Sequence, residues 1–184
     1  QASYDVVSID YRLGLKNASS EGGGMVAMIK LLVQAINFAA EDLFSATRYV
    51  LDHAAEWNID TTKIIASGSS AGAIACLQAE NYICNGNERA KVLDGFNYAG
   101  VISFAGAVFS ASGAPDWKSE PCPMLLFHGN SDSNVPYNKA SAMGVGLYGS
   151  ELIYKQMERR NAPCTLYSYA WRTHDMAVEP MYSN

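Results

Sequence analysis

The stretch that decides the fold is Lys63-Ile64-Ile65-Ala66-Ser67-Gly68-Ser69-Ser70-Ala71-Gly72. Its apolar first half predicts a short buried strand. Residues 71–84, which are rich in Ala, Leu, Gln and Glu, predict a helix that begins directly afterwards. The central serine, Ser70, would therefore lie on a tight turn between a strand and a helix. A Gly-x-Ser-x-Gly pattern in that setting is typical of a nucleophile elbow.

The two glycines of the pattern, Gly68 and Gly72, fit this interpretation. A serine that projects clear of a sheet is expected to leave no room for side chains two positions before and two positions after it. The register is unambiguous, because Ser69 would be flanked by Ser67 and Ala71 rather than by glycines. Ser70 is therefore the candidate nucleophile.

Strands and helices alternate along the chain on both sides of this stretch. Apolar runs predict strands at 4–10, 63–67, 99–104, 123–127 and 164–169. Apolar residues at three- and four-residue steps predict an amphipathic helix over 36–54, and 137–160 has helical character that three glycines weaken. This order predicts an α/β fold: a three-layer α/β/α sandwich around a mostly parallel sheet, with 1–184 as one domain.

Composition and charge exclude several classes of partner. The chain has 184 residues, 49% hydrophobic and 17% charged, with 13 Lys and Arg against 18 Asp and Glu. The resulting net charge of −5 argues against nucleic acid and against an anionic membrane surface. The most apolar long stretch, 25–40, is interrupted by Lys30, Gln34 and Asn37, so no membrane span is expected.

Four cysteines, Cys76, Cys84, Cys122 and Cys164, allow three pairings if all are oxidised. They are interpreted as small buried apolar side chains, with the pairing left open. No Cys-x-x-Cys pair occurs, so neither a zinc site nor a thioredoxin-like redox motif is expected. The low charged fraction and the sequon Asn17-Ala18-Ser19 hint at a secreted or periplasmic location without assigning a compartment.

A serine nucleophile needs a base, and the chain has three histidines. His53 falls within a predicted helix and reads as a packing residue. His128 ends a predicted strand and reads as a structural hydrogen-bonding group. His174 follows the last predicted strand, on the edge of the sheet where the strand C-termini gather, and is therefore the candidate base.

The candidate acid is Asp132, in a loop that follows a predicted strand. Asp116, in an earlier loop, is a rival, whereas Asp175 directly follows His174 and is poorly placed to reach the far ring nitrogen. The chain order Ser70, Asp132, His174 is the order expected after a nucleophile elbow of this kind.

Four stretches together resemble the α/β-hydrolase superfamily, and specifically its bacterial carboxylesterase-like branch. They are 6–13, 40–46, 68–72 and 128–136. The resemblance implies a serine hydrolase with Ser70 as nucleophile, Asp132 as orienting acid and His174 as general base. It also implies that the backbone N–H of Ala71 supplies half of the oxyanion hole, with no cofactor and no metal.

The chain departs from that family at both ends. The family's oxyanion loop precedes the strand that corresponds to 4–10, so it would lie upstream of residue 1, and Gly22-Gly23-Gly24 is not its equivalent. Only residues 175–184 follow His174. The chain is therefore expected to be a truncated hydrolase. An unpaired sheet edge would favour self-association, so a homo-oligomer is possible.

The short interval between Ser70 and Asp132 leaves no room for a sizeable lid. The expected substrate is a small soluble or carbohydrate-linked ester of the acetyl or feruloyl type. Candidate substrate contacts are Ser69, Trp117 and Trp171, with Phe109 on the same side. A prolyl-oligopeptidase-like peptidase, a thioesterase and a non-catalytic binding protein remain alternatives, because specificity lies in pocket shape rather than in the triad.

Overall fold

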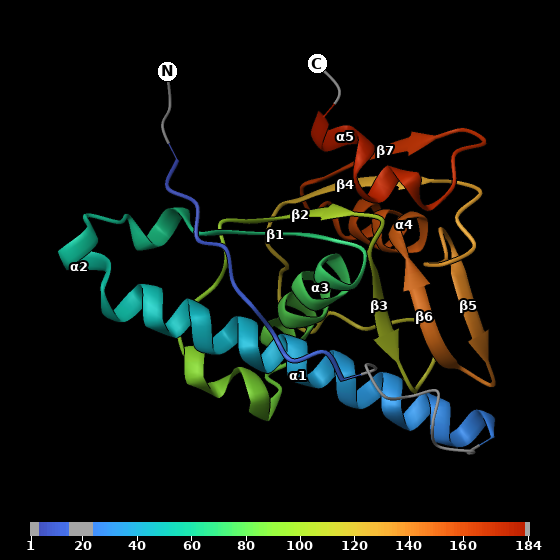
Figure 1. The fold of residues 1–184 in the computed structure, drawn as a ribbon, viewed down its shortest axis with the longest axis horizontal. Helices are drawn as coiled ribbons and strands as arrows, with labels where there is room; N and C mark the ends of the chain where they lie inside the picture. Colours follow the sequence, from blue (N-terminus) through green and yellow to red (C-terminus); the bar gives the residue numbers. More distant parts are fainter. Residues whose placement is uncertain (1–3, 15–23, 183–184) are drawn as a thin grey trace.

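A parallel sheet forms the centre of the molecule. The computed structural model describes residues 4–14 and 24–182. Four strands pair in the order β1-β2-β4-β7, all parallel: β1 (Ile65–Ser69), β2 (Gly100–Phe104), β4 (Met124–Gly129) and β7 (Cys164–Tyr169). Each lies at a predicted strand, and helices flank the sheet (Figure 1). The expected α/β fold class is confirmed.

Three longer helices accompany this sheet: α1 (Met25–Asp52), α3 (Ala71–Cys84) and α4 (Ser150–Arg160). The shorter elements are α2 (Ala54–Trp57), α5 (Glu179–Tyr182) and the 3-10 turns η2 (Thr61–Lys63), η3 (Glu88–Leu93) and η4 (His174–Ala177). None of the helices within the described ranges is long and apolar enough to cross a bilayer.

The core lies on the face of the sheet that meets α3 and α4. Val101 and Met124 are register partners on neighbouring strands and are both buried. They share one apolar cluster with Leu77 of α3 and with Ile153 and Met157 of α4. Burial of these side chains provides the main favourable free energy for packing the helices onto the sheet.

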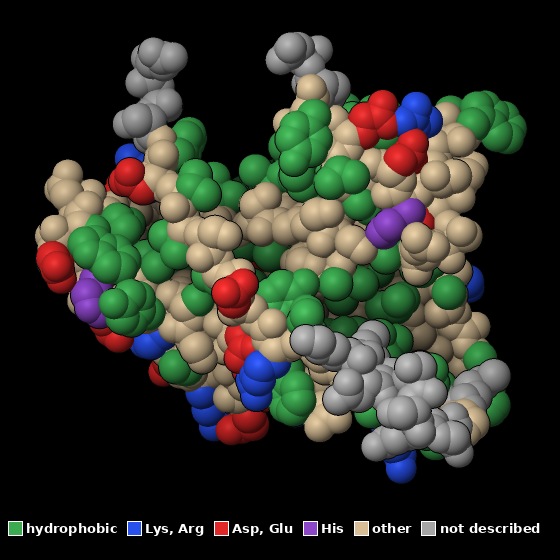
Figure 2. Space-filling model, viewed as in Figure 1, with side chains coloured by type: hydrophobic (Ala, Val, Ile, Leu, Met, Phe, Trp, Pro, Cys, Tyr) green, Lys and Arg blue, Asp and Glu red, His purple; other side chains and the backbone are tan. Residues whose placement is uncertain are grey.

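Alternate residues of the same strands point to the opposite face. There the rings of Phe104, Phe127 and Tyr167 stack across three strands, with centroids 4.9 and 5.0 Å apart. This face is more open, since Tyr167 is 50% exposed. Apolar side chains reach the surface in several places on the molecule (Figure 2).

The prediction of a strand at 4–10 is wrong. The segment is extended but pairs with no described strand, and Val6 is 88% exposed. The physical reason is the lack of a neighbour, because a cavity of about 840 Å³ separates residues 4–9 from the free edge of β1. Arg12 holds the end of the segment against α1 through an ion pair of 2.8 Å with Asp42.

The prediction of one helical region over 137–160 is wrong in its first half. Only α4 is helical there, and it is preceded by a hairpin of β5 (Lys139–Ala142) and β6 (Val145–Gly149). Met143 and Gly144 turn the hairpin with φ of 49° and 83°, the positive values that a tight hairpin turn needs. The glycines that weaken the helical pattern are thus turn and strand residues.

This hairpin completes a second, antiparallel sheet of order β3-β6-β5. Its first strand is β3 (Ala107–Ser110), so Phe109 lies in a strand rather than in the expected loop.

The four cysteines carry free thiols. Cys76, Cys84 and Cys122 are buried and Cys164 is half-buried, which agrees with their interpretation as small apolar side chains. Burial raises the pKa of Cys76 to about 12. The expected self-association of the chain stays a prediction.

Candidate active site

Ser70 lies between β1 and α3 in a strained backbone conformation, with φ of 51° and ψ of −116°. A non-glycine residue with positive φ carries a conformational cost that the surroundings must offset. Here the Ser70 N–H donates to the carbonyl oxygen of Phe104 at 2.8 Å, which ties the turn to β2.

The two glycines of the elbow differ in their surroundings. A Cβ on Gly68 would lie 2.4 Å from the backbone of Gly72, so the expectation of no room is correct at this position. A Cβ on Gly72 would meet nothing within 4 Å, so the same expectation is wrong there. The difference arises because Gly68 faces the first turn of α3, whereas the Cβ position of Gly72 faces open space.

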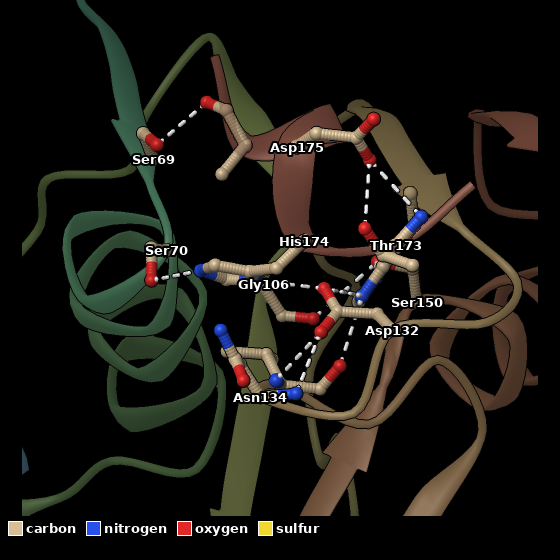
Figure 3. A network of polar contacts seen from close by, with 12 residues as sticks. Ser69, Ser70, Gly106, Asp132, Asn134, Ser150, Thr173, His174 and Asp175 are labelled. Atoms are coloured by element: carbon tan, nitrogen blue, oxygen red, sulfur yellow. Dashed lines mark hydrogen bonds and ion pairs between the residues drawn. The ribbon is translucent and has the colours of Figure 1, made fainter. Parts of the chain in front are cut away.

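His174 faces Ser70 across the end of the sheet. It is the first residue of η4, which follows β7, and its Nε2 lies 2.8 Å from the Ser70 Oγ (Figure 3). Its Nδ1 lies 2.7 Å from Oδ2 of Asp132. One imidazole therefore connects the serine hydroxyl to a carboxylate.

Asp132 is buried in the loop after β4 and is held from both sides. Its Oδ1 accepts the backbone N–H groups of Asn134 at 2.8 Å and Val135 at 3.0 Å. Burial on its own would raise the pKa of Asp132, but the hydrogen bonds from His174 and from these N–H groups outweigh it and lower that pKa. The carboxylate is thus ionised at neutral pH.

The loops that carry Asp132 and His174 are joined directly. The Ser131 N–H donates to the Arg172 carbonyl at 2.9 Å, and the Trp171 N–H donates to Oδ1 of Asn130 at 2.8 Å. A Cβ on Gly129 would lie 2.4 Å from the same Arg172 oxygen, so only glycine permits this approach. The two loops are therefore in direct contact where β4 and β7 end.

A comparison with family models adds the family. The BD-FAE model matches residues 1–108, more than half of the chain. The chain belongs to the BD-FAE family. No curated protein sequence matches it.

Solved structures share the fold of this BD-FAE chain. The carboxylesterase Cest-2923 from Lactobacillus plantarum WCFS1 is 16% identical with a TM-score of 0.55, over 76% of this chain and 56% of that one. Esterase 2 of Thermogutta terrifontis with propionate bound is 24% identical with a TM-score of 0.56, over the same shares. Esterase PE8 is 19% identical with a TM-score of 0.51, over 79% and 57%. The BD-FAE chain thus spans little more than half the length of each.

The other acidic and histidine candidates of the BD-FAE chain have structural partners. Asp175 accepts the N–H of Thr173 at 3.0 Å and pairs with Arg172 at 2.6 Å, while Asp116 accepts the N–H of the next residue. His53 ends α1 and bonds back to the Tyr49 carbonyl. Neither acid bonds to His174. Among the described residues of the BD-FAE chain, no group of three His, Cys, Asp or Glu side chains could hold a metal ion.

The three candidate substrate contacts lie in different environments. Trp117 is 1% exposed and its indole N–H donates to Gln156 at 3.1 Å, so the expectation that it faces the site is wrong and it packs in the core. Ser69 donates its hydroxyl to the Ala177 carbonyl at 2.6 Å and so anchors η4 beside the elbow. Trp171 is 87% exposed in the loop that leads to His174.

Sequence reasoning missed the partners of His128. Its Nδ1 lies 2.8 Å from Oγ of Ser150, and its Nε2 lies 3.2 Å from the Val135 carbonyl and 3.3 Å from Oδ2 of Asp132. Ser150 is 22 residues further along the chain, so no local pattern connects the two residues.

The two elbow glycines should respond oppositely to alanine. Gly68→Ala forces Cβ against backbone atoms and should lower the free energy of unfolding by about 1–3 kcal/mol. Gly72→Ala places its Cβ in open space within the first turn of α3, where alanine should stabilise the helix by about 0.5–1 kcal/mol. Urea denaturation of both variants measures this difference, and equal changes would contradict the close approach at Gly68.

Acid should destabilise the protein through His128. Burial outweighs the nearby Asp132 carboxylate and lowers the pKa of His128. Below about pH 6.5 the unfolded chain therefore takes up a proton that the folded chain does not, until the pH reaches the lowered value. Across this window the free energy of unfolding should decrease as the pH is lowered, by at most about 1.4 kcal/mol per pH unit.

His128→Gln isolates this contribution. Burial raises the pKa of Glu80, which acts with the opposite sign because its stabilisation is lost as the pH rises. Glu80 is present in both proteins, so its contribution cancels in the comparison. When the pH is lowered from 7 to 5, the free energy of unfolding measured by urea denaturation should decrease less for the variant than for the unaltered chain. If the free energy of unfolding depends on pH in the same way for both proteins, His128 takes up its proton as readily in the folded state as in the unfolded state.

Proposed function

We propose that this chain carries the catalytic residues of a serine hydrolase that cleaves carboxylic esters through an acyl-enzyme. The observation that carries the proposal is the continuous hydrogen-bonded series from the Ser70 hydroxyl through His174 to Asp132, at 2.8 and 2.7 Å. Both distances are within the reach that proton transfer requires.

Proton transfer in the first step follows from these contacts. Nδ1–H of neutral His174 donates to the ionised Asp132, which leaves Nε2 as the acceptor for the Ser70 proton. As Oγ bonds to the ester carbonyl carbon, its proton moves to Nε2, and the carboxylate stabilises the imidazolium that forms. The carbonyl π electrons move to the oxygen and produce a tetrahedral oxyanion.

The oxyanion would be stabilised at the start of α3. Ala71 is the first residue of that helix, so its N–H has no acceptor within the helix and adjoins the nucleophile. Collapse of the intermediate breaks the bond to the alcohol oxygen, which takes the proton from Nε2. Water then attacks the acyl-enzyme with His174 again as base, releasing the acid and restoring Ser70. The second oxyanion donor, expected upstream of residue 1, stays a prediction.

We propose an ester rather than an amide or a thioester as the substrate, because each structural neighbour named above is an esterase or a carboxylesterase. The same triad would serve a peptidase or a thioesterase. Within the described residues, the interval from Ser70 to Asp132 is occupied by α3, η3, β2, β3, β4 and the loops that join them. That leaves the site open to a small or carbohydrate-linked acetyl or feruloyl ester.

Labelling of Ser70 tests the proposal. Incubation with a fluorophosphonate should add one mass equivalent, located on Ser70 by peptide mapping, and Ser70→Ala should abolish the adduct. Asp132→Asn should slow labelling by about 10⁴-fold, because it favours the wrong tautomer of the base. Absence of any adduct on folded protein would overturn the catalytic proposal.

Comparison of the rates at which the chain hydrolyses an ester, an anilide and a thioester tests which of these bonds it cleaves. The chain should hydrolyse p-nitrophenyl acetate faster than the corresponding anilide or a thioester, and faster than Ser70→Ala does. Labelling without turnover would indicate an activated nucleophile whose oxyanion stabilisation is incomplete, since loss of one donor costs about 10²–10³-fold.

Trp171 should contribute to binding of aromatic acyl groups. Its exposed ring lies in the loop before His174, so Trp171→Ala should raise KM for methyl ferulate several-fold and leave KM for p-nitrophenyl acetate nearly unchanged. Trp57→Ala is the control, since Trp57 is 39% exposed on α2, which lies at the far left of Figure 1. Equal changes for both substrates would argue against a contact with the aromatic ring.

A further inference from the structure

A second histidine, His128, contacts the same carboxylate oxygen as His174. Its side chain is fully buried near the end of β4, four residues before Asp132. Its Nε2 lies 3.3 Å from Oδ2 of Asp132, the atom that also accepts from His174 at 2.7 Å. Oδ2 thus lies between two imidazole nitrogens.

The partners of His128 determine which of its nitrogens carries the proton. The Val135 carbonyl at 3.2 Å and the Asp132 carboxylate accept hydrogen bonds and donate none, so Nε2 must be the protonated nitrogen. Nδ1 of the neutral ring then accepts the hydroxyl proton of Ser150 at 2.8 Å, which is closer than the Gly106 carbonyl, the other acceptor near this hydroxyl, at 3.4 Å. This serine begins α4, so the His128 ring connects the Asp132 loop to that helix.

Charge and packing support the neutral ring. The groups that face His128 are the carboxylate of Asp132, the phenol ring of Tyr137 in an edge-on contact at 5.6 Å, and His174 beyond the carboxylate. Burial lowers the pKa of His128 despite the nearby carboxylate. A buried imidazole costs desolvation free energy that an apolar side chain would avoid, and here three polar contacts offset that cost.

We infer that His128 is a positioning residue, which holds Oδ2 of Asp132 in line with Nδ1 of His174 and holds the Asp132 loop through the Val135 carbonyl. The inference rests on the proposed function, because it assigns His128 a part in that same site. Val135 is bonded at both ends, since its N–H donates to Oδ1 of Asp132 while its carbonyl accepts from His128. Loss of the Nε2–H donor would leave a buried carbonyl unpaired and allow the loop to shift.

Two substitutions of His128 separate this role from packing. His128→Gln can place an amide N–H near the position of Nε2 and should restore the donor. His128→Asn is shorter, reaches only the Ser150 side and should not. We expect His128→Asn to slow fluorophosphonate labelling of Ser70 by about a hundredfold, the cost of a misplacement of about 1 Å, and His128→Gln to recover most of the rate.

Proton NMR supplies a readout independent of reactivity. The Nδ1–H proton of His174, hydrogen-bonded to Asp132 at 2.7 Å, should give a strongly downfield resonance that Asp132→Asn removes. His128→Asn should shift or broaden this resonance and His128→Gln should restore it. Folding is checked by circular dichroism and by the melting temperature.

The outcomes are separable. If the unaltered chain is not labelled at Ser70, the proposed function fails, and the resonance alone decides the positioning role. A folded His128→Asn variant with an unchanged resonance overturns the inference, as does equal slowing of labelling in the Asn and Gln variants. If His128→Asn does not fold, Ser150→Ala replaces it, because it removes the hydroxyl that bonds Nδ1 of the ring and leaves His128 itself in place. An unchanged resonance in Ser150→Ala would then overturn the inference.

Discussion

The close approach of two loops, where β4 and β7 end, is the constraint on which the candidate site depends. Gly129 has no side chain to keep the Arg172 carbonyl away, and Ser131 donates to that same oxygen at 2.9 Å. Without this approach Asp132 and His174 would be too far apart to share a proton-bearing hydrogen bond. The serine is fixed separately by β1 and β2, so one contact between loops decides whether three residues act together.

The parallel sheet explains why such a contact is possible. The strands run in one direction, so the segments that follow β1, β4 and β7 emerge at the same edge. Buried polar groups then fix their geometry. Both oxygens of Asp132 have partners, and the pKa of that carboxyl is lowered despite burial, so the charge is compensated within the protein.

Sequence patterns identified the parts of this architecture that local chemistry determines. The helix predicted over 71–84 and the strand predicted over 164–169 have the same bounds in the structure. The elbow, Asp132 and His174 could be placed because each follows an apolar strand in the expected order. Their convergence within hydrogen-bonding distance was an expectation that rested on the fold, because no periodicity encodes a contact between residues 42 or 104 positions apart.

The failures have physical reasons of the same kind. Residues 4–10 have strand-like composition, yet a strand requires a hydrogen-bonded neighbour, and here a cavity lies beside them. Residues 139–149 lie next to helix-forming residues, which favoured the prediction of a helix over 137–160. Gly144 instead adopts a φ of 83°, which a hairpin turn requires and a helix does not allow. Trp117 was predicted to face the site because it lies in a loop. In the structure its ring is buried in the core, where Gln156 accepts the hydrogen bond from its indole N–H.

The cavity beside β1 separates two parts of the proposed chemistry. In the proposed mechanism, Ser70 is activated by His174 and Asp132, which follow β7 and β4 and do not line the cavity. Gly68, Ser69 and Gly72 line the cavity itself, so the elbow adjoins it. Activation of the nucleophile therefore does not depend on what fills that space, whereas oxyanion stabilisation beside Ala71 lies close to it. In the proposed mechanism, turnover requires both an activated Ser70 and a complete set of oxyanion donors, so incomplete oxyanion stabilisation would slow turnover even where Ser70 is activated.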